Sequence, residues 1–298
     1  MNVRETIKKT VAKHLESGGQ AFGQCLTAVG WVGGTLPEKY EDEGMVELSM
    51  ADVAGGAIVV GTALRGVRPI YVIRYQGFNW YNSVSIINYA CKSKEMWGVP
   101  CPLFVRSIAM EGSIGPVAGG SHHSLYYRMP GVKIVSPMTP QEYEDCYDDF
   151  MSEDEVYYVS EHRGSYDNSR ELRDIEYNNP DIVLFPISIT RFAAQKASYA
   201  LREQGIKAAV YHQVTIKPSF FTSNSLNALT RAGKGIVLDD DYVNGVASSF
   251  AADLMLETGA KVTTMGLEDR TAGFAEHFDN LPPSKEDIIR NVRIITQN

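Results

Sequence analysis

Two polar positions in this sequence could carry acid–base chemistry. Asp52 opens a stretch rich in Ala and Gly, Asp52–Gly66, which predicts a helix. Its carboxylate either caps that helix or acts on a bound molecule, and periodicity alone favours the cap. His122 and His123 are adjacent in a polar, glycine-rich segment, SIGPVAGGSHHSL. A lone histidine is usually structural, but an adjacent pair in a loop, with pKa values near neutral, favours a functional role.

Aromatic and basic side chains elsewhere could bind a flat or an anionic group. Tyr75, Phe78 and Tyr81 are candidates to stack on a planar ring, an interaction that contributes about 1 kcal/mol. At least one of the three is expected to fill the core. Arg163 could bind an anionic substrate group, and a surface salt bridge is an equally good interpretation.

The glycines of the Asp52–Gly66 stretch indicate close packing. A glycine costs about 1 kcal/mol relative to alanine inside a helix, so several together need a packing reason. Gly55, Gly56 and Gly61 do not form a dinucleotide-binding fingerprint. Their spacing is not GxGxxG, and they lie inside the predicted helix, whereas the fingerprint lies in the turn before it.

The composition excludes several classes of protein. A formal net charge of −8 argues against nucleic-acid binding, which needs a basic face. No apolar run reaches the ~20 residues of a membrane helix, and the charged, amphipathic N-terminus lacks the apolar region of a signal peptide. A cytoplasmic location is therefore expected. The cysteines show no metal-binding spacing, and Asp239–Asp241 is expected to be a solvated turn, so the sequence assigns no metal ligand.

Around these residues, short β-branched runs alternate with helical patterns. This alternation predicts an α/β fold of two mainly parallel-sheet domains, residues 1–165 and 181–298, joined by a polar linker over 166–180. The predicted strands are Val46–Leu48, Pro69–Ile73, Leu103–Arg106, Lys133–Val135, Val156–Val159, Ile182–Pro186, Ala208–His212, Gly235–Leu238 and Lys261–Thr264. The predicted helices are Ala51–Arg65, Tyr81–Trp97, Pro140–Met151, Arg191–Gln204, Ser223–Arg231 and Val246–Glu257.

The segment Glu47–Arg74 resembles the pyrimidine-binding domain shared by transketolases and the beta subunits of 2-oxoacid dehydrogenases. In that family a glutamate precedes a small-residue helix ending in Gly-x-(Arg/Lys)-Pro, and Gly66-Val67-Arg68-Pro69 matches the ending. Counting back without a gap places Asp52 where the family glutamate stands. Further similar segments are Phe78–Tyr81, Ile87–Lys92, Gly119–Ser124, Met129–Pro137, Glu161–Arg163, Ile206–Pro218 and Gly235–Leu256.

The resemblance implies a transketolase-like pyrimidine-binding domain, a transketolase C-terminal-like domain and thiamine diphosphate as cofactor. It gives Asp52 the family glutamate's role, a hydrogen bond to a ring nitrogen of the aminopyrimidine, with roughly 1.5 Å less reach. Phe78 is the best match for the residue that stacks on that ring. The family histidine steers protons or holds the substrate carboxylate. Alignment to transketolases favours His122 for it, and alignment to dehydrogenase beta subunits favours His123.

A partner chain is also implied. The family holds the diphosphate and its Mg²⁺ with a Gly-Asp-Gly…Asn motif on another domain, and this sequence contains no Gly-Asp-Gly. An alpha-type subunit is therefore expected to carry that domain, with the cofactor at the interface. The family precedent is an α2β2 heterotetramer.

Three functions remain open. The first is decarboxylation of a small 2-oxoacid, of pyruvate or branched-chain type, with transfer of the acyl unit. The second is half of a split transketolase or carboligase, which transfers a two-carbon unit to a sugar or another carbonyl. Ala118 stands where transketolases have a substrate-binding aspartate, and Glu161-His162-Arg163 is the dehydrogenase-like ending, so both features favour the first. The third is a degenerate, non-enzymatic subunit, marked by Asp52 in place of glutamate.

Overall fold

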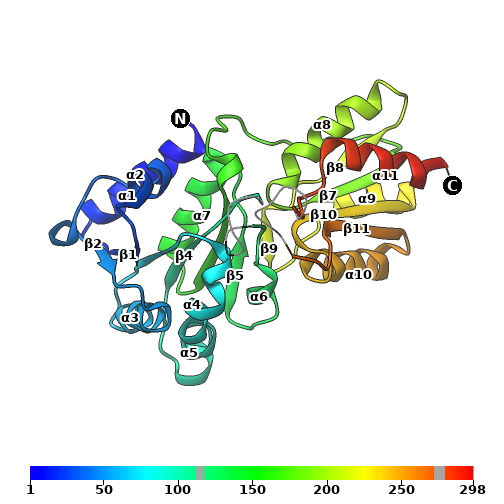
Figure 1. Ribbon diagram of the computed structural model, residues 1–298. Coiled ribbons are helices and arrows are strands. Elements are labelled where there is room, and N and C mark those ends of the chain that lie inside the picture. The colour runs from blue at the N-terminus through cyan, green and yellow to red at the C-terminus, as the bar shows by residue number, and fades with distance from the viewer. Residues whose placement is uncertain (112–116, 118, 272–278, 298) are drawn as a thin grey trace. The chain divides into compact units, whose positions relative to one another are not determined.

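The computed structural model describes residues 1–111, 117, 119–271 and 279–297. The chain divides into two compact units (Figure 1). The first comprises Met1–Met110 and Leu125–Glu171, and the second comprises Glu111–Ser124 and Leu172–Asn298. The segment with the two histidines therefore groups with the C-terminal unit. The domain boundaries expected from the sequence stay a prediction.

The first unit is built on parallel strands in the order β2-β1-β3-β4-β6-β5. Their bounds are β1 Ala21–Gln24, β2 Met45–Leu48, β3 Ile70–Ile73, β4 Leu103–Ala109, β5 Val132–Val135 and β6 Val156–His162. Every residue of β3, β4 and β6 is buried, as expected for parallel strands covered on both faces. The helices are α1 Val3–Glu16, α2 Ala28–Gly34, α3 Asp52–Leu64, α4 Asn79–Ser85, α5 Cys91–Trp97, α6 Ser124–Tyr127 and α7 Pro140–Ser152.

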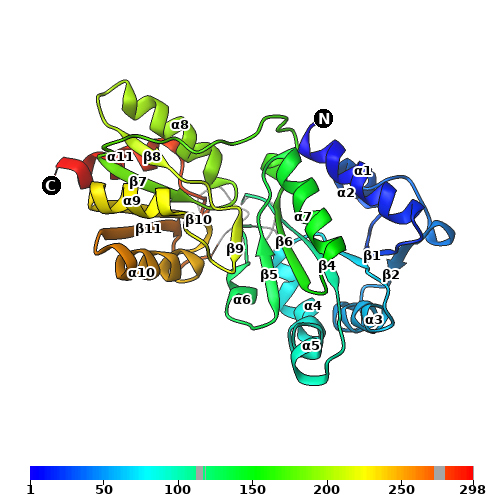
Figure 2. The same ribbon diagram turned by 180° about the vertical axis from the view of Figure 1, so that it is seen from behind.

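Helices cover this sheet on both sides. α1 packs against α7 and α3 packs against α4, and the two views show these pairs on opposite sides of the strands (Figure 2). A π-helical segment, Ile86–Ala90, joins α4 to α5, so the single helix predicted over Tyr81–Trp97 is interrupted. Short 3₁₀ helices occupy Glu41–Glu43, Gln76–Phe78 and Arg163–Ser165.

A buried ion pair lies inside the first unit. Arg106 on β4 donates from Nε and Nη2 to the two carboxylate oxygens of Glu161 on β6, at 2.7 and 2.9 Å. The hydroxyls of Tyr143 and Tyr166 donate to the same carboxylate at 3.3 and 2.9 Å. Glu161 is thus a structural residue of the core, because its charge is compensated by this network.

The second unit has parallel strands in the order β11-β10-β7-β8. The bounds are β7 Ile182–Pro186, β8 Ala208–Val210, β10 Lys234–Tyr242 and β11 Lys261–Leu267, with a short β9 at Thr215–Lys217. The helices are α8 Thr190–Arg202, α9 Ser223–Ala232, α10 Val246–Thr258 and α11 Lys285–Gln297. α8 packs against α11 over an apolar core that includes Leu184, Leu201 and Ile288.

The predicted fold class, two mainly parallel α/β units, is confirmed. The prediction of a solvated turn at Asp239–Asp241 is wrong. β10 continues through these residues to Tyr242, and all three aspartates are buried at 2% exposure or less. In the described ranges, no helix combines the length and apolarity needed to cross a membrane.

Candidate functional site

Asp52 is the first residue of α3, but its carboxylate does not cap the helix. The N-cap position is Ala51, and no side-chain cap hydrogen bond is present. Oδ1 of Asp52 instead accepts a hydrogen bond of 2.7 Å from Nδ2 of Asn82 on α4. The same Nδ2 donates to the carbonyl of Phe78 at 3.0 Å, and Oδ1 of Asn82 accepts from the Tyr71 hydroxyl. The carboxylate is therefore held by a buried, oriented amide.

The glycines of α3 make this arrangement possible. A Cβ on Gly56 would lie 2.5 Å from the carbonyl oxygen of Asn82, and one on Gly55 would lie 3.0 Å from the Tyr71 hydroxyl. Side chains there would push α4 and β3 away from α3. Burial, with the charge of Asp52 adding to it, raises the pKa of Tyr71 above its usual value, so this hydroxyl stays a donor.

A cavity of about 140 Å³ lies beside Asp52. It is found at the carboxyl ends of β1 and β3, the edge at which parallel sheets usually bind ligands. Its lining includes Asp52, Asn82, Arg74, Tyr75 and Phe78. The Tyr75 and Phe78 ring centroids are 6.1 Å apart, in a tilted arrangement. The sequence-predicted residues Asp52, Tyr75 and Phe78 are therefore brought together.

Tyr81 lies apart from this cavity. It is 60% exposed and borders a separate surface hollow with residues of α3, including Val53 and Ala57. The aromatic cluster predicted from the sequence thus divides into two residues at the cavity and one on the surface. The cofactor-binding role predicted for Tyr81 stays a prediction.

Two guanidinium groups lie over the Tyr75 ring. Cζ of Arg74 is 5.6 Å from the ring centroid, and Cζ of Arg163 is 5.5 Å from it. Nε of Arg74, and Nε and Nη2 of Arg163, are buried and make no hydrogen bond within the described ranges. Buried N–H groups without acceptors are costly, so this pair is suited to receiving an anion.

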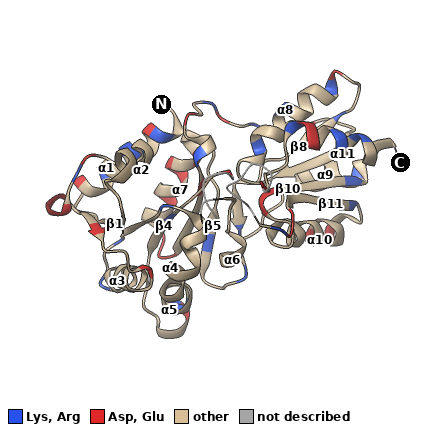
Figure 3. Ribbon diagram, viewed as in Figure 1, with Lys and Arg blue, Asp and Glu red and all other residues tan. Residues whose placement is uncertain are grey.

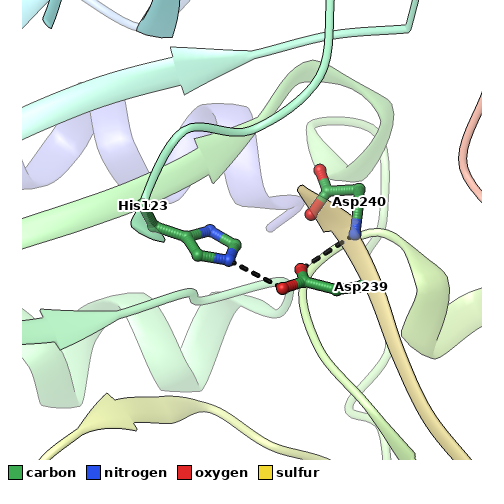
Figure 4. Close-up of side chains that lie close together, drawn as sticks. All are labelled: His123, Asp239 and Asp240. Atoms are coloured by element: carbon green, nitrogen blue, oxygen red, sulfur yellow. Dashed lines mark hydrogen bonds and ion pairs between the residues drawn. The ribbon is translucent and has the colours of Figure 1, made fainter. Parts of the chain in front are cut away.

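The histidine segment lies in the second unit, against the end of β10. Figure 4 shows the His123 imidazole directed at Asp239, with Nε2 of His123 3.1 Å from Oδ2 of Asp239. Burial by itself lowers the pKa of His123, but Asp239, Asp241 and Asp240 outweigh it and raise the pKa to about 9. Burial and the charge of Asp239 raise the pKa of Asp240 to about 7. His123 is therefore a buried imidazolium at neutral pH.

His122 has a different environment. It is partly exposed, and its ring centroid lies 6.3 Å from that of Tyr242. Burial and the positive charge of His123 lower its pKa, while the charge of Asp241 opposes them. Ala118, the position at which transketolases have a substrate-binding aspartate, lies outside the described residues.

Three residues that line the cavity beside Asp52 were not identified from the sequence. Asn82, Tyr71 and Arg74 carry no motif of their own, and Asn82 meets Asp52 across 30 residues of chain. The only available signal was position, because Tyr71 and Arg74 lie in and directly after the β-branched run that predicts β3. Asp239 was interpreted as part of a solvated turn. The apolar run Gly235–Leu238 lies directly before it, so the predicted strand could have been continued into Asp239.

Comparison with known proteins agrees with the family resemblance found in the sequence. The sequence model of the family described as "Transketolase, pyrimidine binding domain" matches residues 12–168. The chain is 24% identical to the 2-oxoisovalerate dehydrogenase subunit beta of Bacillus subtilis, over 74% of this chain and 72% of that protein. It is 24% identical to the mitochondrial pyruvate dehydrogenase E1 component subunit beta-1 of Arabidopsis thaliana, over 97% and 88% of the two chains.

Among solved structures, the chain is similar to a split-gene transketolase described as an inactive beta4 tetramer. The TM-score is 0.74 at 15% identity, and the similarity covers 100% of this chain and 98% of that one. At this identity the likeness concerns the fold.

Proposed function

The chain belongs to the family of the transketolase pyrimidine-binding domain, and on that premise we propose that it is the beta-type subunit of a heteromeric, thiamine-diphosphate-dependent enzyme. The proposed reaction is decarboxylation of a small 2-oxoacid, of pyruvate or branched-chain type, with transfer of the acyl unit. The observation that carries the proposal is the cavity in which Asp52, fixed by Asn82, lies beside Phe78.

The cavity fits the pyrimidine end of the cofactor. A dry cavity of about 150 Å³ holds a benzene-sized ring, and this one has about 140 Å³. Phe78 supplies an aromatic face, and Asp52 supplies a carboxylate for a ring nitrogen. Asn82 bonds Oδ1 of Asp52, so the carboxylate that stands in for the longer family glutamate is held in one orientation. When bound, thiamine diphosphate supplies an electron sink for the decarboxylation.

Each remaining group receives a proposed role. The carboxylate of Asp52 holds a proton at the pyrimidine nitrogen. Arg74 and Arg163 bind the substrate carboxylate, since their buried Nε groups lack acceptors within the described ranges. A histidine of the His122-His123 pair contacts the substrate and moves a proton, which suits an imidazole.

The surface of α3 supports a partner chain. Residues that face outward from this helix are apolar or small, and Val53, Ile58 and Leu64 are 51%, 49% and 41% exposed. The inward face is apolar too, so α3 is apolar on both sides, and Figure 3 shows it almost without charged residues. A helix that is apolar all round is normally buried. The proposed partner is an alpha-type subunit that binds the diphosphate and Mg²⁺, in an α2β2 assembly.

A cytoplasmic location is part of the same proposal. None of the cysteines forms a disulfide, and burial raises the pKa of the Cys101 thiol to about 11. Thiols of this kind are inert and are typical of proteins from reducing compartments.

A second candidate is half of a split transketolase or carboligase. The Arg74 and Arg163 guanidinium groups favour it as well, because paired guanidiniums bind phosphate as readily as carboxylate. A substrate panel separates the two candidates. Decarboxylation of 2-oxoacids supports the first, and transfer of a two-carbon unit between sugar phosphates supports the second.

The experiment combines this chain with an alpha-type chain that contains Gly-Asp-Gly…Asn. The complex should decarboxylate a 2-oxoacid only when thiamine diphosphate and Mg²⁺ are added, as measured with an artificial electron acceptor. Calorimetry on this chain alone should show no tight cofactor binding, because the phosphate contacts are charge-assisted and lie on the partner. Micromolar binding by the chain alone would refute the two-chain proposal. A complex that binds cofactor but turns over no substrate would favour a degenerate subunit.

A further inference from the structure

The acidic run at the end of β10 has no role in the function proposed above. We propose that Asp239, Asp240 and Asp241 are positioning residues that fix the segment 121–124, so that His122 is the histidine that contacts substrate. The inference rests on the proposed function and deepens it, because it assigns the substrate-facing histidine and the residues behind it.

Each aspartate of the run holds a different residue of the segment. Oγ of Ser121 donates to Oδ2 of Asp240 at 2.7 Å, and the backbone N–H of Ser121 donates to the Asp240 carbonyl at 3.0 Å. Nε2 of His123 lies 3.1 Å from Oδ2 of Asp239. The backbone N–H of Ser124 donates to Oδ2 of Asp241 at 2.9 Å. Three successive residues of one strand thus bind three of four successive residues of the segment.

The backbone on both sides of the segment is closely packed. A Cβ on Gly120, whose φ is +76°, would lie 2.5 Å from a methyl group of Leu267. A Cβ on Gly245 would lie 2.0 Å from Oγ of Ser124, and that Oγ accepts the N–H of Val246 at 3.0 Å. Glycine is therefore required at both places, and the segment has little freedom to shift.

Burial decides between the two histidines. The side chain of His123 is fully buried and engaged by Asp239, whereas His122 is partly exposed. Only His122 can reach a molecule in solvent without breaking the contacts above. The charges of Asp241 and His123 affect the pKa of His122. The charges of Asp239, Asp241 and Asp240 affect the pKa of His123. A fixed imidazolium at His123 keeps the neighbouring His122 neutral, the form that accepts a proton.

The test begins with ¹³C-histidine NMR of the full chain, a readout independent of turnover. In the wild type, one imidazole should titrate near pH 9, the value to which Asp239 and its neighbours raise the pKa of His123. In Asp239→Asn this titration should move toward neutral pH, and that of His122 should change with it. The matched control is Glu257→Gln, which removes an exposed carboxylate from α10 of the same unit. If D239N accumulates poorly, Ser121→Ala removes one hydrogen bond and is the milder variant; it should also move the His122 titration.

Turnover in the reconstituted complex is the second readout. Asp239→Asn should lower kcat by roughly tenfold while the cofactor Kd stays constant, and Asp239→Glu should restore part of the loss. His122→Ala should lower kcat by roughly 100-fold or more. Normal turnover in H122A together with loss in H123A would overturn the assignment. If the NMR shifts appear and no variant of the complex, wild type included, has activity, then the proposed function fails and the positioning contacts stand.

A bound cation would also overturn the inference. The donor atoms of His123, Asp239 and Asp240 all lie within 4.8 Å of one another. If elemental analysis finds one divalent ion per chain, lost in D239N, then these residues are ligands and His123 is not an imidazolium. The expected result is no stoichiometric metal in either protein.

Discussion

Replacing Asp52 with alanine tests whether its carboxylate takes part in catalysis or only stabilises the fold. Within the described ranges, the Asp52 side chain makes one hydrogen bond, from Nδ2 of Asn82, and it does not cap α3. After Asp52→Ala, Nδ2 of Asn82 keeps the carbonyl of Phe78 as an acceptor at 3.0 Å. We therefore expect the free energy of unfolding to fall by less than about 1.5 kcal/mol, the net value of one hydrogen bond.

Turnover should respond far more strongly. Loss of a group that holds a proton in the reaction costs about 100-fold or more, or roughly 2.7 kcal/mol of barrier. The assay measures cofactor-dependent decarboxylation by the reconstituted complex, with chemical denaturation of the chain and size-exclusion chromatography of the complex in parallel. The control is Asp149→Ala, which removes an exposed carboxylate from α7. Turnover within threefold of wild type in D52A, with assembly intact, would refute the role given to Asp52.

Three further predictions concern stability and substrate binding. Because the pKa of His123 is raised to about 9 from 6.5, its stabilisation is complete below about pH 6.5 and is lost as pH rises through 9, so the Tm should fall over that window and fall less in D239N. Gly56→Ala should destabilise the chain by about 1–3 kcal/mol, since its Cβ would lie 2.5 Å from the Asn82 carbonyl oxygen. The control Gly61→Ala, where a Cβ meets nothing within 4 Å, should be neutral or stabilising. Equal denaturation midpoints for the two variants would contradict this prediction. Arg163→Ala should raise the KM of the complex for an anionic substrate by about tenfold or more with a smaller change in kcat, because it removes a guanidinium whose Nε and Nη2 lack acceptors within the described ranges; an unchanged KM would argue against a substrate role.

Much of the architecture was predictable from local patterns. β3, β7 and α7 lie within about one residue of their predicted bounds. β3 and β7 are continuous apolar runs, α7 has helical periodicity, and all three have clear ends. β1, at Ala21–Gln24, was missed, since Ala, Phe, Gly and Gln carry no β-branched signal. The interruption between α4 and α5 was missed too, because the sequence across it contains no glycine or proline that would signal a break.

The residues of the candidate sites also divide into those that the sequence identified and those that it did not. Asp52, Tyr75 and Phe78 were named from their order along the chain and meet at one cavity. They follow β2 and β3, which flank β1 in a parallel sheet and therefore end at the same edge. Arg74 was not named, since a lone arginine after a strand carries no pattern. The acidic run Asp239–Asp241 was misinterpreted because three adjacent carboxylates are normally solvated.

Local sequence patterns were sufficient to predict the α/β class, the resemblance to the pyrimidine-binding domain family and some of the chemically capable residues, among them Asp52, Tyr75 and Phe78. These depend on periodicity and on residue types at fixed spacing, which are local properties of the chain. The fold was needed to show that Asn82 orients Asp52, that Tyr81 lies apart from the cavity and that His123 is buried against Asp239. Those outcomes depend on which distant segments share a buried environment. In such an environment the cost of an unpaired charge selects the partner of each polar group, and local sequence does not encode that choice.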